Sequence, residues 1–252
     1  MTNIILVGCN GKMGQVICRL VDNDPDARIV CGVDISGEKK NDFPVYTEFN
    51  TEIKGDAIID FSHPSALTGT LEFAKSAGLP AVVATTGFSE DQKRELSEAA
   101  KSAPIFFSAN MSLGINLIIQ LAQRATQLLE DSFDIEIIEK HHNQKIDAPS
   151  GTALAIADAI DGVSKSDNEY IYDRHDVRKK RSKREIGIHA VRGGTIVGEH
   201  TVLFAGQDEI VEITHKATSK EIFAVGAVKA AKFMVGKAPG MYNMQNLVAE
   251  ME

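Results

Sequence analysis

The sequence predicts an α/β protein of two domains, the first of them an open parallel sheet. Up to about Asn110, short apolar runs alternate with amphipathic runs of helical length, which is the pattern of βαβ units. Beyond that point the elements are longer, and two strand-like segments joined around Gly206 predict an antiparallel pair. The length of 252 residues fits one large domain or two ordinary ones.

Each element of the first region follows from its apolar pattern. Apolar runs of strand length predict strands at Ile4–Val7, Ala27–Val33, Ala57–Phe61, Ala81–Ala84 and Pro104–Phe107. The stretches between them predict helices at Lys12–Val21, Pro64–Ser76 and Glu90–Lys101. The carboxyl ends of parallel strands meet at one edge of the sheet, where open α/β sheets bind ligands.

The second region predicts a sheet-plus-helix domain. Helices are expected at Leu113–Leu129, where Leu113, Leu117, Leu121 and Leu128 have helical spacing, at Ala153–Ile160 and at Ala224–Met234. Strands are expected at Asp134–Lys140, Thr195–Phe204 and Ile210–His215. The basic run Arg174–Arg184 is interpreted as a solvated loop, and Arg192, Gly193 and Gly194 as a mobile connection after it.

Composition and charge exclude several classes of function. Lys and Arg number 27 and Asp and Glu 35, a net charge of −8 that disfavours binding to nucleic acid or to an anionic membrane. The apolar stretch Leu113–Leu129 contains too many polar residues to span a bilayer. Cys9, Cys18 and Cys31 lack metal-site spacing, so we expect no metal and a reducing, cytoplasmic compartment.

A glycine loop directly follows the first predicted strand. It runs Gly8-Cys9-Asn10-Gly11-Lys12-Met13-Gly14 and ends in the predicted helix. Such a turn lets a pyrophosphate approach the backbone at a helix N-terminus, although an ordinary tight turn also uses glycine. Asp34 ends the next strand, 20 residues beyond Gly14, where its carboxylate would accept hydrogen bonds from ribose hydroxyls. Together these features predict a Rossmann-type dinucleotide domain.

Two more loops follow predicted strands at the same edge. They are Thr85-Thr86-Gly87 and Ser108-Ala109-Asn110-Met111-Ser112. Their position favours ligand binding, but each taken alone is equally the composition of an ordinary loop.

The densest chemistry lies between Glu139 and Ala153. Ser150 is a plausible N-cap, so the backbone N–H groups of Gly151 and Thr152 would favour an anion, and Lys145 adds a positive charge. His141 or Lys145 could donate a proton. A polar loop before a capped helix is the simpler alternative. A metal site is disfavoured, since adjacent strand residues such as His141 and His142 point to opposite faces.

At these residues the chain resembles the 4-hydroxy-tetrahydrodipicolinate reductases, also called dihydrodipicolinate reductases, nearly from end to end. The most specific match is the segment His141-His142-Asn143-Gln144-Lys145-Ile146-Asp147-Ala148-Pro149-Ser150-Gly151-Thr152-Ala153. Further matches are Val7–Gly14, Ala84–Phe88, Ser108–Ser112, Val197–His200 and Thr214–Ala217.

The resemblance implies an activity and a fold. A nicotinamide cofactor would reduce 4-hydroxy-tetrahydrodipicolinate, a cyclic dicarboxylate, to tetrahydrodipicolinate in the diaminopimelate route to lysine. It also implies a Rossmann domain over 1–111 and 220–252, completed by the C-terminal helix. A substrate domain with a mixed open sheet over 112–219 would build a homotetramer.

Residue roles follow from the same match. His141 and Lys145 stand at the proton-donor positions. The residues expected to hold substrate carboxylates are His142, Lys145, Ser150, Gly151, Thr152 and Lys220, which stands where several relatives have arginine. The residues expected to line the cofactor site are Gly8, Asn10, Gly11, Lys12, Met13, Gly14, Asp34, Thr85, Thr86, Gly87, Ser108, Ala109, Asn110 and Met111.

One departure from the family pattern bears on the cofactor. Many relatives follow the acidic ribose residue with arginine, which suits a 2′-phosphate, whereas Ile35 follows Asp34 here. This favours NADH over NADPH, although Lys39 and Lys40 lie close by in the sequence.

Two alternatives have distinct signatures. Another two-domain dehydrogenase, acting on an amino acid or semialdehyde, would leave the anion site from Lys145 to Thr152 unexplained. A dinucleotide-sensing regulator would use the basic run as a nucleic-acid patch, but that run has no interleaved aromatic residues.

Overall fold

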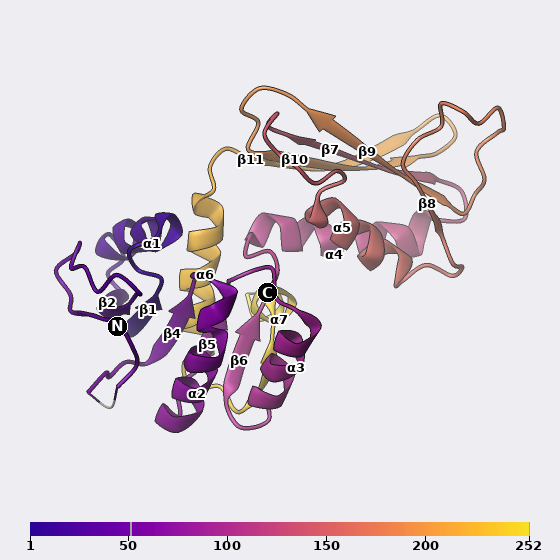
Figure 1. The fold of residues 1–252 in the computed structure, drawn as a ribbon. Coiled ribbons are helices and arrows are strands. Elements are labelled where there is room, and N and C mark those ends of the chain that lie inside the picture. The colour runs from indigo at the N-terminus through magenta and orange to yellow at the C-terminus, as the bar shows by residue number, and fades with distance from the viewer. Residues whose placement is uncertain (51, 252) are drawn as a thin grey trace. The chain divides into compact units, whose positions relative to one another are not determined.

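The computed structural model describes residues 1–50 and 52–251, which divide into two compact units. Unit 1 comprises Met1–Leu113 and Glu221–Glu252, and unit 2 comprises Gly114–Lys220. The last helices of the chain therefore return to the N-terminal sheet (Figure 1). Among the described helices, none is long and apolar enough to cross a membrane.

Unit 1 contains a seven-stranded sheet in the order β12-β6-β5-β4-β1-β2-β3, with every pairing parallel. The strands are β1 (Thr2–Val7), β2 (Ala27–Val33), β3 (Val45–Tyr46), β4 (Ala57–Asp60), β5 (Ala81–Val83), β6 (Pro104–Phe107) and β12 (Gly240–Tyr242). The strand order reverses between β1 and β4, so the ligand-binding switch point lies at their carboxyl ends. The predicted parallel sheet is confirmed.

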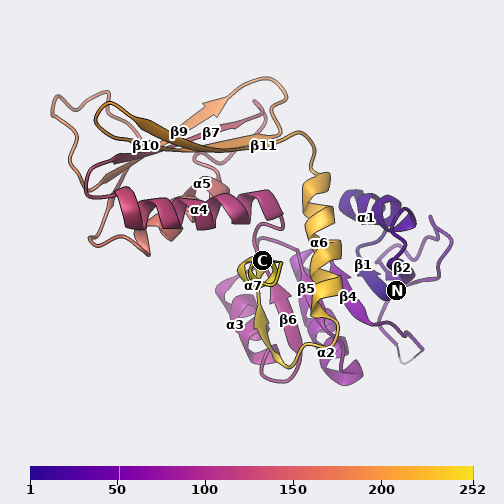
Figure 2. The ribbon, with the colours of Figure 1, turned by 180° about the vertical axis from the view of Figure 1, so that it is seen from behind.

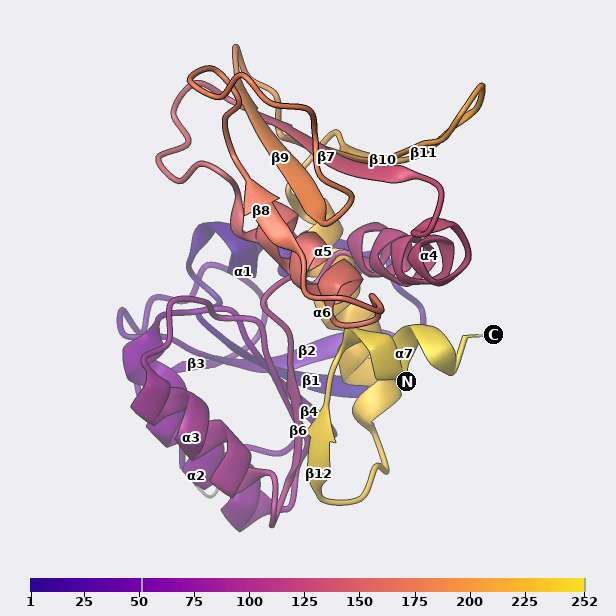
Figure 3. The same ribbon diagram turned by 90° about the vertical axis from the view of Figure 1, so that its right-hand side faces the viewer.

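Helices cover both faces of this sheet (Figure 3). They are α1 (Lys12–Asp22), the 3₁₀ turn η1 (Pro64–Ala66), α2 (Leu67–Ala77), α3 (Glu90–Ala99), α6 (Glu221–Met234) and α7 (Met244–Ala249). Alternate residues of β1 face opposite sides: Ile4 and Leu6 pack with α1, α6 and α7, and Ile5 and Val7 pack with α2 and α3. Both faces are therefore buried, which explains the continuous apolar strands.

Unit 2 contains a mixed five-stranded sheet in the order β11-β10-β7-β9-β8. Its elements are α4 (Leu113–Leu129), β7 (Asp134–His141), α5 (Gly151–Asp161), β8 (Glu169–Ile171), β9 (Glu185–Arg192), β10 (Gly198–Ala205) and β11 (Ile210–Ala217). α4 and α5 lie on one face, over a core rich in isoleucine (Figure 2). We call this the inner face of the sheet and the opposite face the outer face.

The structure differs from the sequence prediction mainly around β9. The mobile connection predicted at Arg192 is wrong, because Arg192 ends a strand that pairs in parallel with β7. The short strands β3, β8 and β12 and the helix α7 were also not predicted. In α4 the leucines used for the helical pattern, Leu117, Leu121 and Leu128, are exposed, and Ile115, Ile118 and Ala122 form the buried stripe.

Candidate functional site

The glycine loop joins β1 to α1 and has no room for side chains at two positions. A Cβ at Gly14 would lie 2.2 Å from the carbonyl oxygen of Gly8. One at Gly8, where φ is +79°, would lie 2.7 Å from the carbonyl oxygen of Phe61. Gly11, the N-cap of α1, supplies no side-chain hydrogen bond to the helix. A phosphate is a natural partner for this helix start, because its N–H groups and the helix dipole both favour an anion.

Asp34 contacts the glycine loop directly. Its carboxylate accepts hydrogen bonds from the backbone N–H groups of Asn10 (3.0 Å) and Ser36 (3.1 Å). The Asn10 side-chain amide donates to Ser36 Oγ and to the Glu38 carbonyl oxygen, while its own oxygen is buried without a partner among the described residues. The loop and the turn after β2 thus form one surface that carries an acidic side chain.

A cavity of about 1360 Å³ opens along this surface at the carboxyl ends of β1, β2 and β4. Its lining contains six predicted cofactor residues: Gly8, Asn10, Gly11, Lys12, Met13 and Asp34. It also contains Ile35, which bears on the cofactor preference, and residues that the sequence reasoning missed, among them Glu38, Phe61, Ser62, His63 and Phe73. Ser62 and His63 could have been found, since they follow a predicted strand at the switch point. The glycine turn, the acidic strand end and this volume fit a dinucleotide.

The remaining predicted cofactor residues do not line that cavity. They are Gly14, Thr85, Thr86, Gly87, Ser108, Ala109, Asn110 and Met111. Thr85 is buried, and its hydroxyl donates to the Asp60 carboxylate (2.9 Å). Ser108 donates to the Asn110 carbonyl oxygen (2.9 Å). The loops after β5 and β6 are thus locally ordered at the same sheet edge as the glycine loop.

In unit 2, the predicted anion-binding segment is organised by Glu139, a residue of β7 with no exposed surface. Its carboxylate accepts hydrogen bonds from His141 Nδ1 (2.6 Å), the Ser150 backbone N–H (2.9 Å) and both terminal nitrogens of Arg192 (2.7 Å each). Burial alone would raise the pKa of Glu139, but the hydrogen bonds from Arg192, His141 and Ser150 outweigh it and lower that pKa. Glu139 is therefore a buried, ionised carboxylate.

Ser150 is the N-cap of α5, as predicted, and its hydroxyl accepts a hydrogen bond from the Ala153 backbone N–H (3.1 Å). The same oxygen lies 3.1 Å from His200 Nε2. Burial, and next the charge of His141, lower the pKa of His200 to about 4, so His200 is neutral at pH 7. The His141 and His200 rings meet edge to face, 5.2 Å between centroids.

Lys145 contacts a carboxylate of its own loop. Its Nζ lies 2.8 Å from Asp147 Oδ1. The hydrogen bond from Lys145 lowers the pKa of Asp147. Lys145 thus already binds a carboxylate in the loop just before α5.

Two predicted substrate residues lie outside these contacts. His142 is half-buried just after β7, and its carbonyl oxygen accepts a hydrogen bond from the Lys145 backbone N–H. Lys220 is exposed, between β11 and α6 at the end of unit 2. Within residues 1–50 and 52–251, no group of three or more His, Cys, Asp and Glu side chains could hold a metal ion.

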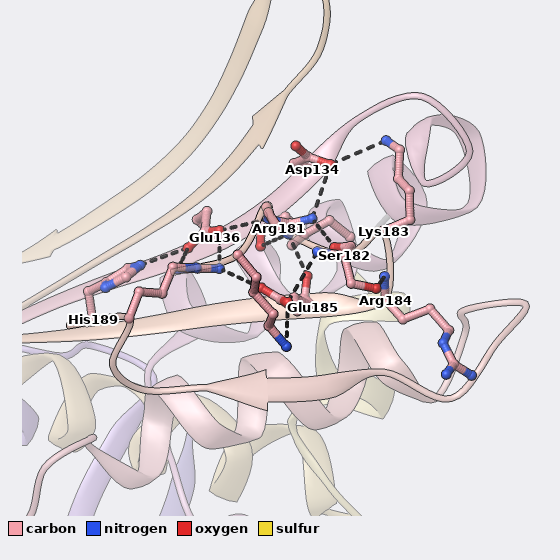
Figure 4. A network of polar contacts seen from close by, with 11 residues as sticks. Asp134, Glu136, Arg181, Ser182, Lys183, Arg184, Glu185 and His189 are labelled. Atoms are coloured by element: carbon pink, nitrogen blue, oxygen red, sulfur yellow. Dashed lines mark hydrogen bonds and ion pairs between the residues drawn. The ribbon is translucent and has the colours of Figure 1, made fainter. Parts of the chain in front are cut away.

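The basic run folds back onto the outer face of the unit 2 sheet (Figure 4). Arg181, whose side chain is 18% exposed, donates to Asp134 and Glu136, and Arg174 donates to Glu136 and Glu185. Arg174 and Arg181 are partly buried, whereas the other residues of the run form an exposed loop, as interpreted from the sequence. Asp134, Glu136 and Glu185 pair with basic residues of the run, and these carboxylates disfavour its use as a phosphate-binding patch.

Comparisons with known proteins agree along the whole chain. The family model for the dihydrodipicolinate reductase N-terminus matches residues 2–111, and the model for its C-terminus matches residues 114–248. A 4-hydroxy-tetrahydrodipicolinate reductase of Caldanaerobacter subterraneus is 52% identical, covering 98% of both chains. One of Clostridium tetani is 50% identical, over 97% of this chain and 96% of its own.

Solved structures show the same architecture. A dipicolinate-bound dihydrodipicolinate reductase from Paenisporosarcina sp. TG-14 superposes with a TM-score of 0.81 at 25% identity, covering 98% of this chain and 99% of that one. A diaminopimelate dehydrogenase of C. glutamicum shares the fold, with a TM-score of 0.58, 14% identity and coverage of 98% and 95%.

The parallel sheet with its glycine turn, together with the family match over that unit, defines an NAD(P)H-dependent oxidoreductase. The matches over both units narrow this class of enzyme to one family. The chain belongs to the dihydrodipicolinate reductase family, whose members act in lysine and diaminopimelate biosynthesis.

Proposed function

We propose how this chain carries out its family's reaction, the reduction of 4-hydroxy-tetrahydrodipicolinate to tetrahydrodipicolinate with NAD(P)H. One observation carries the proposal. A carboxylate, that of Asp147, already lies 2.8 Å from Lys145 Nζ, in the loop just before α5. A carboxylate of the substrate would bind Lys145 in its place, and the backbone N–H groups at the start of α5 would bind it as well. Thr152, in α5, and His142 complete this proposed substrate site.

Unit 1 holds the cofactor in the cavity along the glycine loop. Gly8, Gly11 and Gly14 let the pyrophosphate reach the start of α1, and Asp34 accepts hydrogen bonds from the adenosine ribose. Asn10, Lys12 and Met13 line the same cavity. The loops 85–87 and 108–111 are proposed to complete the nicotinamide end. Bound NAD(P)H supplies the hydride.

NADH is the proposed preferred cofactor. Asp34 is followed by the exposed apolar side chain of Ile35, and Glu38 also lines the cavity. Lys40 is the nearby cation, but its Nζ lies 3.5 Å from the Glu38 carboxylate, which offsets its charge. A 2′-phosphate would meet two carboxylates here, so we expect kcat/KM to favour NADH by about tenfold or more. Equal or better use of NADPH in steady-state assays would contradict this.

His141 is the proposed proton donor, and Lys145 the residue that binds a substrate carboxylate. His141 is held through Nδ1, so its Nε2 is the atom that can exchange a proton. Lys145 already pairs with the carboxylate of Asp147, as expected of a residue that binds a substrate carboxylate. Overall, one hydride and one proton are added to the substrate, and the 4-hydroxyl group leaves as water.

The test follows cofactor absorbance with substrate made freshly by the synthase of the preceding step. We expect His141→Gln to lower kcat by about 10²-fold or more, with little change in KM. Lys145→Ala should raise KM and lower kcat. The matched control is Lys140→Ala, since Lys140 lies on the outer face and pairs with Glu199 (3.2 Å). Kinetics like the control's in both variants would refute the assignment.

We also propose a homotetramer and a cytoplasmic location. The outer face of the unit 2 sheet carries Ile138 and Leu203, and Val191, which is 45% exposed, so this face suits an interface between copies. The three cysteines are buried free thiols, as suits a reducing compartment. Sedimentation velocity tests the assembly, and a monomer at micromolar concentration would contradict it.

A further inference from the structure

We propose that Glu139 is the positioning residue of the reaction: it sets the proton-donating nitrogen of His141 and fixes the start of α5 relative to it. The inference rests on His141 being the proton donor, as proposed above. It concerns a residue that touches neither substrate nor cofactor and acts through its neighbours.

The hydrogen bonds of Glu139 are evenly divided between its two oxygens. Oε1 accepts from the Ser150 backbone N–H and one nitrogen of Arg192, and Oε2 accepts from His141 Nδ1 and the other nitrogen of Arg192. Arg192 therefore binds in the two-point geometry that suits a carboxylate. With no exposed surface and four donors, this carboxylate has one orientation.

The ionised state of Glu139 decides which nitrogen of His141 carries a proton. An ionised carboxylate can only accept, so at 2.6 Å the Nδ1 of His141 must donate. In the neutral ring Nε2 is then the unprotonated nitrogen, and in the charged ring Nε2–H is the proton that can leave.

Gly198, on β10, lies beside that nitrogen. A Cβ added to Gly198 would lie 3.1 Å from His141 Nε2. Any larger residue at position 198 would therefore crowd the proton-donating atom. The charged and titratable groups in contact with the His141 side chain and its carboxylate partner are Glu139, Arg192 and His200, and the charges of His215 and Lys145 act on His200.

Glu139 also connects the proton donor to the anion site. Glu139 accepts a hydrogen bond from the backbone N–H of Ser150, the N-cap of α5. The backbone N–H of the next residue, Gly151, is proposed to donate to a substrate carboxylate. One side chain thus sets the position of both groups. A substrate bound to the start of α5 would meet His141 at a constant distance.

Glu136 provides a matched control on the same strand. It lies three residues earlier and faces the outer side, where it binds His189 Nε2 (2.7 Å), Arg174 and Arg181 (Figure 4). It has the same kinds of partner as Glu139, but none of them belongs to the proposed site. Glu136→Gln therefore measures the effect on the fold of losing a paired carboxylate on β7, without any change in the proposed site.

The experiment compares Glu139→Gln and Glu136→Gln by pH-dependent steady-state kinetics. We expect Glu139→Gln to lower kcat at least about tenfold. The shape of its kcat/KM–pH profile should also change, because His141 loses the acceptor that fixes which ring nitrogen carries the proton. Glu136→Gln should keep the wild-type rate and profile. A wild-type profile in Glu139→Gln, or equal changes in both variants, would overturn the proposal.

A measurement on the wild type keeps the proposal testable if Glu139→Gln fails to fold. Histidine-selective ¹⁵N NMR, with the His141 signal identified by its loss in His141→Gln, reports which nitrogen is protonated in the neutral ring. We expect Nδ1, and a proton on Nε2 would overturn the proposal. Full activity of His141→Gln would instead refute the donor assignment, which is a separate failure.

Discussion

Two glutamates on β7, three residues apart, bind a histidine and arginine side chains on opposite faces of one sheet. Glu136, on the outer face, is 16% exposed and holds Arg174 and Arg181 of the basic run. Glu139, on the inner face, is fully buried and holds His141, Arg192 and the start of α5. A glutamate bound to histidine and arginine thus anchors a surface loop on one face and orders a proposed reaction centre on the other. The two sites differ in how deeply the glutamate is buried and in which segments its partners belong to.

The largest expected effect is on stability, from removing the arginine on each face. Arg192→Leu leaves Glu139 buried without its main counter-charge, so we expect the free energy of unfolding to fall by about 3 kcal/mol. Arg174→Leu removes a side chain that is 34% exposed, Glu136 keeps Arg181, and Glu185 keeps the Ser182 backbone N–H and Lys179, so we expect at most about 1 kcal/mol. Urea denaturation of both variants tests this. Equal losses would mean that burial does not separate the two faces.

The sequence predicts most of unit 1 because its signals are local. Each strand and helix there is a continuous run with its own period, and the glycine loop is recognised from seven adjacent residues. The short strands β3, β8 and β12 have no such signal, since two or three residues become strands only through pairing. Polar and apolar residues alternate in Glu185–Arg192, which is the pattern of a strand, but the basic run beside this segment favoured a loop.

The site in unit 2 shows where sequence reasoning ends. His141, Lys145 and Ser150 stand in one segment and could be selected by residue type and spacing. Arg192 is 53 positions from Glu139, and only the parallel pairing of β7 with β9 brings them together. Likewise, the pattern of the segment does not show that Asp147 lies on Lys145, because that contact depends on how the loop turns into α5.

A second prediction concerns pH and the two histidines His200 and His189. The pKa of His200 is about 4 in the folded protein and about 6.5 in the unfolded chain. Between these values the unfolded chain binds the proton and the folded protein does not, so stability is lost as the pH falls from 6.5 toward 4. This loss amounts to about 2 kcal/mol between pH 7 and pH 5.

Replacing His200 tests that contribution. His200→Gln retains a polar group toward Ser150 and should flatten the acid dependence of the unfolding free energy between pH 7 and pH 5. His189→Gln, on the outer face, is the comparison for the substitution itself, since the His189 ring is 41% exposed and has no contact with Ser150 or His141. Urea titrations at several pH values measure both. An unchanged slope in His200→Gln would show that the acid sensitivity arises elsewhere.

The smallest expected effect concerns the carboxylate that lies on the proposed substrate donor Lys145. Asp147→Asn removes a negative charge that competes for Lys145, so an added dicarboxylate should bind more tightly, by about three- to tenfold. Titration with dipicolinate by calorimetry measures the change. Asp134→Asn is the control, since Asp134 pairs with Arg181 and Lys183 on the outer face. Tighter binding in both variants would indicate a general charge effect. Weaker binding in Asp147→Asn alone would show that Asp147 positions Lys145 and does not occupy the place of the substrate.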